Sequence, residues 1–305
     1  MIMLNTEYSA MTFNVGFCAS DNTFSFFMDG GDYSRARSKE ILIDNMEDIA
    51  SDIRNTLPDI TIIQEVDVDG RRSYHVNELE YFEDELYYGN YVYSQNYDSP
   101  YLFYPFTDPS GSTKAGLLTC SNFTFTESLR RSLPISTSFS KFFDLDRCYS
   151  ITKIAVNNGK ELCIYNIHLS AYGSNAEIRQ GQLNMLMDDI EKDIQKGNYV
   201  ICGGDFNHNL RSGNETNVPE WAQPFPKEVL PTNSSFAFDT ALYSMIDHNS
   251  CRNLDTAYNK DKTFTVLLDG FIVSSNIEVT YYESLNWEYE RSDHDPVYMK
   301  FKLLN

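Results

Sequence analysis

Acidic, amide and histidine residues stand at the ends of several short apolar runs in this 305-residue chain. Asn14 ends the first run and Glu65 the second, while Asp205 and Asn207 follow a later one, Tyr199–Cys202. Runs of this kind, rich in β-formers, predict buried strands. The polar side chains are therefore expected at strand tips, where a rigid scaffold presents binding and catalytic groups.

The residue types favour a site for a divalent cation. Mg²⁺ prefers hard oxygen ligands and keeps several waters, so one or two carboxylates plus a substrate phosphate are sufficient. Glu65 is the best candidate for a direct ligand and Asp293 is the next. Asn14 would orient or complete the ligand shell. Mn²⁺ is the alternative ion for the same oxygen ligands.

The remaining polar residues suggest hydrolysis by an activated water. Asp205 would orient or deprotonate that water, and Asn207 would hydrogen-bond a phosphoryl oxygen. His294 and Asp269 form an expected pair, because a carboxylate fixes the tautomer of an imidazole and favours its protonated form. A protonated His294 could then donate to the phosphoryl oxygen as negative charge develops. The pair could also be a purely structural ion pair.

Three further basic residues are candidates for substrate contact. Arg147 and Arg179 could reach a phosphate, although arginines of this kind are more often surface or structural residues. His208 stands next to Asn207 and could contact the substrate from there. These three residues complete the predicted substrate-binding set.

The elements that would position these residues are mainly strands. Continuous apolar runs suit strands that are buried on both faces. The runs are Met11–Val15, Ile60–Gln64, Leu117–Thr119, Leu162–Ile167, Tyr199–Cys202 and Gly270–Val273.

Two amphipathic helices are expected between the strands. The first begins near Ser38, a good N-cap, and Pro58 follows its end. The second begins at Ser174, where Ser174 and Glu177 match a capping box, and Gly197 would end it. Because helices must cover sheet faces, the economical arrangement is two packed sheets with helices outside.

Composition narrows the function further. Lys and Arg number 24 against 44 Asp and Glu, which gives a net charge of −20. Sequence-independent binding to a polyanion rests on basic residues, so this excess of acidic residues disfavours such binding.

The sequence gives no sign of a membrane-spanning segment, because it contains no run of about 18 apolar residues. The N-terminus shows no signal peptide, so a cytoplasmic location is expected. The six scattered cysteines are expected to be buried free thiols.

The motifs together, in chain order, read N…QE…HL…GDFN…LD…SDHDP. This set resembles the endonuclease/exonuclease/phosphatase family, which includes deoxyribonuclease I, abasic-site endonucleases, bacterial sphingomyelinases and inositol polyphosphate 5-phosphatases. The resemblance runs from about Thr12 to Val297. It implies an α/β fold, a four-layer αββα sandwich of two mixed β-sheets packed face to face with helices outside. It also implies that His168 contacts phosphate, where abasic-site endonucleases usually carry a tyrosine.

The chain is accordingly expected to be a single domain, residues 1–305, with a loop-rich insertion at about 209–260. The expected function is Mg²⁺-dependent hydrolysis of a phosphodiester, for example by a nuclease. The alternatives are a phosphomonoesterase for a small metabolite or lipid headgroup, and a non-catalytic binding module. The net charge slightly favours a small substrate over a polyanionic polymer. The substrate is thus a phosphate ester, either nucleic acid or a small phosphorylated molecule, and no protein partner is implied.

Two segments could form the rim of the site. They are Tyr97–Phe106 and Asp144–Tyr149. Aromatic side chains there could stack a nucleobase or meet a lipid surface, but a packed loop is the simpler expectation.

Overall fold

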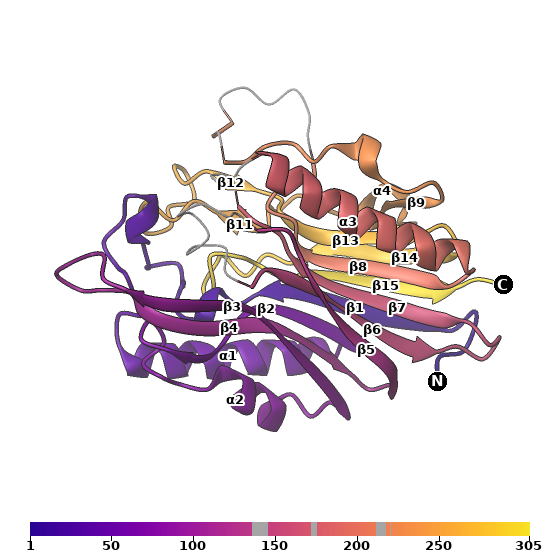
Figure 1. Ribbon diagram of the computed structural model, residues 1–305, viewed down its shortest axis with the longest axis horizontal. Coiled ribbons are helices and arrows are strands. Elements are labelled where there is room, and N and C mark those ends of the chain that lie inside the picture. Colours follow the sequence, from indigo (N-terminus) through magenta and orange to yellow (C-terminus); the bar gives the residue numbers. More distant parts are fainter. Residues whose placement is uncertain (136–145, 172–175, 212–217, 220) are drawn as a thin grey trace.

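Two β-sheets lie face to face with helices on their outer faces, in the four-layer αββα sandwich that the sequence predicts (Figure 1). The computed structural model describes residues 1–135, 146–171, 176–211, 218–219 and 221–305. Both sheets are mixed. In the first sheet β1 (Glu7–Asn14) runs parallel to β2 (Ile60–Gly70). In the second, β7 (Glu161–His168) runs parallel to β8 (Tyr199–Asp205).

Within the described residues, the first sheet has seven strands in the order β10-β14-β15-β1-β2-β4-β3 and the second has six in the order β5-β6-β7-β8-β13-β9. The other strands of the first sheet are β3 (Asn90–Leu102), β4 (Gly111–Ser121), β10 (Ser244–Met245), β14 (Ile277–Ser284) and β15 (Val297–Leu303). Those of the second are β5 (Phe125–Ser132), β6 (Cys148–Ala155), β9 (Ser234–Phe236) and β13 (Asp269–Ser274). A separate pair is formed by β11 (Cys251–Arg252) and β12 (Thr265–Val266).

The helices confirm much of the predicted pattern. They are α1 (Lys39–Thr56), α2 (Glu78–Glu85), α3 (Ala176–Gln195) and α4 (Ala237–Thr240), with short 3-10 helices η1 (Gly16–Cys18), η2 (Phe27–Asp29) and η4 (Lys227–Val229). Ser38 caps α1, because its side chain accepts a hydrogen bond from the backbone N–H of Ile41. The predicted capping serine of α3, Ser174, lies outside the described residues. Gly197 has a φ of +76° just beyond α3, as a helix stop requires.

Buried side chains fill the three spaces between the four layers. Residues of both sheets, including Ile62 and Ile164, form the cluster between the sheets. The apolar face of α1 packs with Phe13 and Ile63 on the outer face of the first sheet. The apolar face of α3 packs with Val200 on the outer face of the second. Strand β8 is buried along its whole length, so the prediction of strands buried on both faces is confirmed there.

A buried polar contact links the two sheets next to the site edge. Gln64 at the end region of β2 donates from Nε2 to Oδ1 of Asn166 on β7, at 2.8 Å. Asn166 in turn donates from Nδ2 to the backbone oxygen of Leu118, at 3.0 Å. Both side chains are fully buried, and a satisfied buried pair of this kind favours one relative placement of the sheets.

Some predictions need correction. The strands β3, β5, β6, β14 and β15 and the helix α2 were not anticipated. The tip between β3 and β4 is not a packed loop, because Phe103, Tyr104 and Phe106 are 68%, 63% and 84% exposed. Residues 144 and 145 of the other rim segment lie outside the described residues. All six cysteines are free and buried, as expected.

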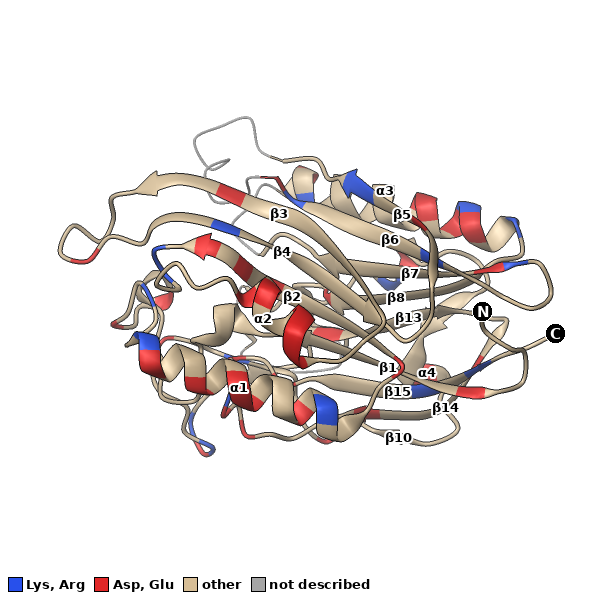
Figure 2. Cartoon of the chain, turned by 90° about the horizontal axis from the view of Figure 1, so that it is seen from below, with Lys and Arg blue, Asp and Glu red and all other residues tan. Residues whose placement is uncertain are grey.

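The excess of acidic over basic residues is visible on the outer helices. Asp and Glu outnumber Lys and Arg along α1 and α2 (Figure 2). In the part of the chain that the structure describes, no helix is both long and apolar enough to cross a membrane.

Candidate active site

The predicted site residues meet at one edge of the paired sheets. Asn14 is the last residue of β1, and Glu65 follows the position on β2 that pairs with it. In the second sheet His168 and Asp205 end the parallel strands β7 and β8 and are direct cross-strand partners. Asp269, the first residue of the antiparallel strand β13, also pairs with Asp205. Parallel neighbours end at the same edge, so strand order alone assembles this group.

Glu65 is displaced from the regular ladder of β2. The pairing of β2 with β4 shifts register between Ile63 and Val66, as in a β-bulge, and Glu65 has a φ of +59°. Bulges re-aim side chains, and a non-glycine residue in the left-handed region is a strained one that often marks a functional site. The side chain of Glu65 is 27% exposed and lines the cavity described below.

The turn after β8 places Asp205 and Asn207. Gly204 must be glycine, because its φ is +139° and an added Cβ would lie 2.0 Å from the backbone oxygen of Ile167. Asp205 Oδ1 accepts a hydrogen bond from the backbone N–H of Asn207 at 2.8 Å. The side-chain Nδ2 of Asn207 donates to the backbone oxygen of Leu169, at 2.8 Å. A second amide hydrogen remains for another acceptor, since an amide nitrogen carries two.

Asp205 lies at the centre of the polar cluster. Its Oδ2 accepts from Asn14 Nδ2 at 3.2 Å, and the same nitrogen lies 3.3 Å from Glu65 Oε1. Asp205 Oδ2 is also 3.6 Å from His168 Nε2 and 3.7 Å from His294 Nε2. Burial raises the pKa of Asp205 to about 7, against the opposing effect of the His294 charge. A carboxylate with a near-neutral pKa is suited to general-base work.

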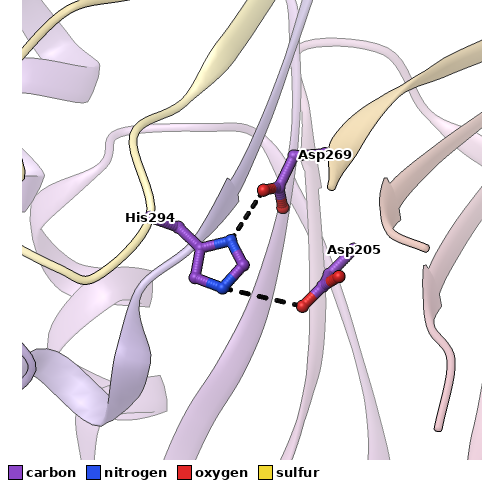
Figure 3. Close-up of side chains that lie close together, drawn as sticks. All are labelled: Asp205, Asp269 and His294. Carbon is purple, nitrogen blue, oxygen red and sulfur yellow. Dashed lines mark hydrogen bonds and ion pairs between the residues drawn. The ribbon is translucent and has the colours of Figure 1, made fainter. Parts of the chain in front are cut away.

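The two histidines beside Asp205 have opposite electrostatic environments. His294 Nδ1 is 2.6 Å from Asp269 Oδ2 (Figure 3). Burial alone would lower the pKa of His294, but the Asp269 carboxylate overrides it and holds that pKa well above the usual value. Burial lowers the pKa of His168 well below the usual value, and the charges of Arg147 and His294 lower it further. These environments favour the protonated form of His294 and the neutral form of His168, the kind of divergence that marks acid–base sites.

The donor set fits a hard divalent cation. Burial raises the pKa of Glu65, and the charge of Asp293 raises it further while Arg72 opposes both effects. A cation between these carboxylates would relieve that repulsion. The amide oxygen of Asn14 accepts from the backbone N–H of Gly16 at 3.0 Å, and its nitrogen faces Glu65 and Asp205, so Asn14 orients the carboxylates. Ligand atoms of Asp205, Asp269 and His294 also lie within 4.8 Å of one another. Asp269 and His294 are already hydrogen-bonded to each other, which leaves the carboxylates of Glu65 and Asp293 more accessible to a cation.

A cavity of about 610 Å³ opens above this cluster. Its lining includes the predicted residues Glu65, Arg147, His168, Asp205, Asn207, Asp293 and His294. Asn14 and Asp269 contact these residues without belonging to the lining. Arg179 and His208 are also outside the lining among the described residues. His208 Nδ1 is instead 2.7 Å from the backbone oxygen of Phe206, and burial lowers its pKa.

Two arginines that line the cavity, Arg72 and Arg252, were missed from the sequence. Arg72 forms a two-point ion pair with Asp67, at 2.7 and 3.0 Å, and its guanidinium lies 4.2 Å from the ring centre of Phe17. Its Nη2 is 3.9 Å from Glu65 Oε2. The sequence signal that could have indicated Arg72 was its position, seven residues after the candidate metal ligand Glu65.

The fold and the site together define a class, the α/β phosphoester hydrolases with an acidic, histidine-containing site at the edge of two packed sheets. The sequence model of the endonuclease/exonuclease/phosphatase family matches residues 11–294, and the chain belongs to this family. Members of the family are phosphoester hydrolases.

Solved structures share the fold at low sequence identity. A family protein from Beutenbergia cavernae is 16% identical with a TM-score of 0.70, over 98% of this chain and 72% of that one. The mannosyl-6-phosphatase Bt3783 of Bacteroides thetaiotaomicron is 16% identical with a TM-score of 0.61, over 96% and 99%. The 2′,3′-cyclic phosphatase ANGEL2 is 15% identical with a TM-score of 0.62, over 97% and 95%. No curated protein matches the sequence.

Proposed function

We propose that the protein is a Mg²⁺-dependent phosphoesterase that hydrolyses a phosphodiester bond by attack of water on phosphorus. The observation that carries this proposal is the arrangement around Asp205. A buried carboxylate with a pKa of about 7 lies between a protonated and a neutral histidine, beside a second group of carboxylates. This combination supplies a base, a charged donor and cation ligands within one cavity.

Each residue then has one task. Asp205 accepts the proton of the attacking water, because its pKa lies close to neutral pH. His294, kept protonated by Asp269, donates to a phosphoryl oxygen as charge develops. His168 and the free amide hydrogen of Asn207 hold the other oxygens. A divalent cation bound by Glu65 and Asp293, with Asn14 orienting Glu65, would supply further charge neutralisation when present.

A phosphomonoesterase is the second candidate, and two observations favour it. The cavity of about 610 Å³ contains Arg72 and Arg147, which suits a small anionic substrate. The net charge of −20 also removes the general attraction on which polyanion binding depends. The printed name of one structural neighbour, a mannosyl-6-phosphatase, is that of a phosphomonoesterase, which agrees with this alternative.

A substrate panel tests the reaction. The purified protein is incubated with Mg²⁺, Mn²⁺ or EDTA and with single-stranded and duplex DNA, RNA, a generic phosphodiester, sphingomyelin, inositol phosphates and sugar phosphates. Cleavage of a diester that requires metal supports the first candidate. Selective release of phosphate from a monoester supports the second. Equal turnover in EDTA would exclude metal dependence.

The role of Asp205 is tested separately by Asp205→Asn. We expect a loss of activity of roughly 100- to 10,000-fold with an unchanged fold, because the base is removed and the shape is kept. Asp188→Asn, on the exposed side of α3, is the matched control and should retain full activity. Full activity in a folded Asp205→Asn protein would contradict the assignment of the base.

A further inference from the structure

A second polar region lies in the same cavity on the β3 side of Glu65. It is formed by Arg72, Asn96 and Arg147, which all line the cavity. We call these three residues the β3-side subsite. None of them takes part in the contacts around Asp205 described above, except that Arg147 Nη1 donates to the backbone oxygen of His168 at 3.3 Å.

The Glu65 carboxylate separates this subsite from the reaction centre. Its Oε1 is the oxygen near Asn14 Nδ2 and His168 Nε2, at 3.3 and 4.0 Å. Its other oxygen, Oε2, is 3.9 Å from Arg72 Nη2. The two carboxylate oxygens thus have different nearest partners, Asn14 for Oε1 and Arg72 for Oε2. A group bound at Arg72 would neighbour the scissile phosphoryl group without replacing it.

Arg72 is fixed in place before any substrate binds. Its Nε and Nη2 are held by the fully buried carboxylate of Asp67, and the ring of Phe17 covers one face of the guanidinium. Among the described residues, Nη1 makes no hydrogen bond. A held guanidinium with a remaining donor is well suited to an anion, because little side-chain entropy is lost when the anion binds.

Asn96 provides an independent indication of a missing ligand. Its side chain is 2% exposed, and Nδ2 has no hydrogen-bond partner among the described residues. Buried amide donors are normally paired, so an unpaired one requires an explanation. The pairing of β3 with β4 shifts register between Gln95 and Tyr97, which places Asn96 in a bulge. Bulges next to active sites re-aim side chains, and this one places Asn96 among the residues that line the cavity.

The chemistry of the three residues specifies their ligand. Two guanidinium groups and one amide offer only donors to the cavity from these nitrogen atoms, and arginine matches the geometry of phosphate and carboxylate oxygens. Asp67 binds two nitrogens of Arg72 and leaves its Nη1 for an anion in the cavity. The charges of both arginines also act on His168, which confirms that they lie next to the reaction centre.

We propose that the β3-side subsite binds a second anionic group of the substrate, a phosphate or carboxylate that neighbours the scissile ester. This inference rests on the proposed phosphoesterase function and names the substrate class: a phosphoester with two anionic groups, one cleaved and one held. The cavity then recognises the substrate through the group that does not react.

Matched substrates test this selectivity. The diester pair is thymidine 5′-(p-nitrophenyl phosphate) with and without a 3′-phosphate, and the monoester pair is glucose 1,6-bisphosphate and glucose 6-phosphate. We expect the second phosphate to raise kcat/KM at least about 10-fold, mainly through KM, in the pair that is hydrolysed. A carboxylate in place of the second phosphate distinguishes the two anion types.

Two variants connect the preference to the subsite. Asn96→Leu and Arg147→Gln should each reduce the preference by about 10-fold, whereas Arg54→Gln, at the far end of α1, should leave it unchanged. Asn96→Leu removes an unpaired buried amide, so it is expected to fold. Equal kcat/KM values for both members of each pair in the wild-type protein would overturn the inference.

Binding of inorganic phosphate to the metal-free protein separates this inference from the proposed function. We expect calorimetry to show a Kd that is about 10-fold weaker in Asn96→Leu and Arg147→Gln than in the wild-type protein and Arg54→Gln. If no substrate were hydrolysed but this difference held, the subsite would stand and the proposed function would fail. If all four proteins bound phosphate equally or not at all, the subsite would be refuted.

Discussion

At the scale of single residues, the environment of each titratable group decides its role. His168 and His294 lie within 3.6 and 3.7 Å of the same carboxylate oxygen, and both are buried. Only His294 has its own carboxylate partner, Asp269, so its pKa rises while that of His168 falls. One buried aspartate thus separates two chemically identical side chains into a cationic and a neutral donor.

Asp269→Asn tests this separation through the pH dependence of activity. Loss of the carboxylate lowers the pKa of His294, so its proton is lost at a lower pH. The alkaline limb of the pH–rate profile should move to lower pH, and kcat should fall roughly 100-fold or more. The second pair, His248 and Asp295 at 2.6 Å, provides a control, since Asp295→Asn should leave the limb in place. An unmoved limb in Asp269→Asn would show that Asp269 does not control that titration.

The sequence identified polar residues that follow apolar runs and was silent about those that depend on distant contacts. Its expectation of a strand tip was wrong for Glu65, which lies at a bulge within β2. Glu65, Asp205 and His294 could be predicted because residue type and position after an apolar run already limit their roles. Arg72 and Asn96 could not, because their placement depends on a partner carboxylate and on a register shift between strands. Neither leaves a periodic pattern in the local sequence.

At the scale of elements, length and apolar pattern determined which ones could be predicted. The helix α1 has a full amphipathic stripe and a capping serine, both visible in the sequence. The helix α2 has only eight residues, five of them acidic, and it buries just Glu78 and Phe82. Short helices gain most of their stability from packing, which single-sequence patterns do not show.

The buried glutamate of α2 makes stability depend on pH. Burial and the charge of Asp67 raise the pKa of Glu78 well above its usual value, so the folded protein keeps this proton. The unfolded chain releases it above about pH 4.3. Unfolding therefore becomes more favourable as pH rises, until the folded pKa is reached. The slope is at most about 1.4 kcal/mol per pH unit.

Glu78→Gln should remove this dependence. Urea denaturation between about pH 5 and pH 7 should show the free energy of unfolding of the variant rising relative to the wild type as pH increases. Glu80 lies on the exposed side of the same turn. The free energy of unfolding of Glu80→Gln should therefore change with pH in parallel with that of the wild type. Parallel curves for Glu78→Gln and the wild type would mean that Glu78 is ionised in the folded protein.

At the scale of the whole molecule, the layers could be predicted and the strand order could not. Two helices that each lead into a buried strand require sheets with covered faces. The order β10-β14-β15-β1-β2-β4-β3 depends on pairing between residues hundreds of positions apart, such as Glu7 with Lys302. Local propensity carries no information about such pairs.

A cation at the site should stabilise the whole fold, since it relieves repulsion between carboxylates. At a Mg²⁺ concentration about 100 times Kd, the free energy of unfolding should rise by about 2.7 kcal/mol. Glu65→Gln should abolish most of this gain, and Glu47→Gln, on the exposed face of α1, should retain it. Calorimetric melting with and without Mg²⁺ measures the effect. An equal gain in both variants would place the cation elsewhere.

The left-handed backbone at Glu65 has a consequence for how this protein would evolve in the laboratory. A bulged position with a φ of +59° that holds a partly buried carboxylate opposes folding in the absence of metal. A library selected only for heat resistance, without metal and without a requirement for activity, should therefore enrich glycine or asparagine at position 65. Sequencing the survivors would show it. Thermal stability without metal and catalytic activity therefore favour different residues at position 65.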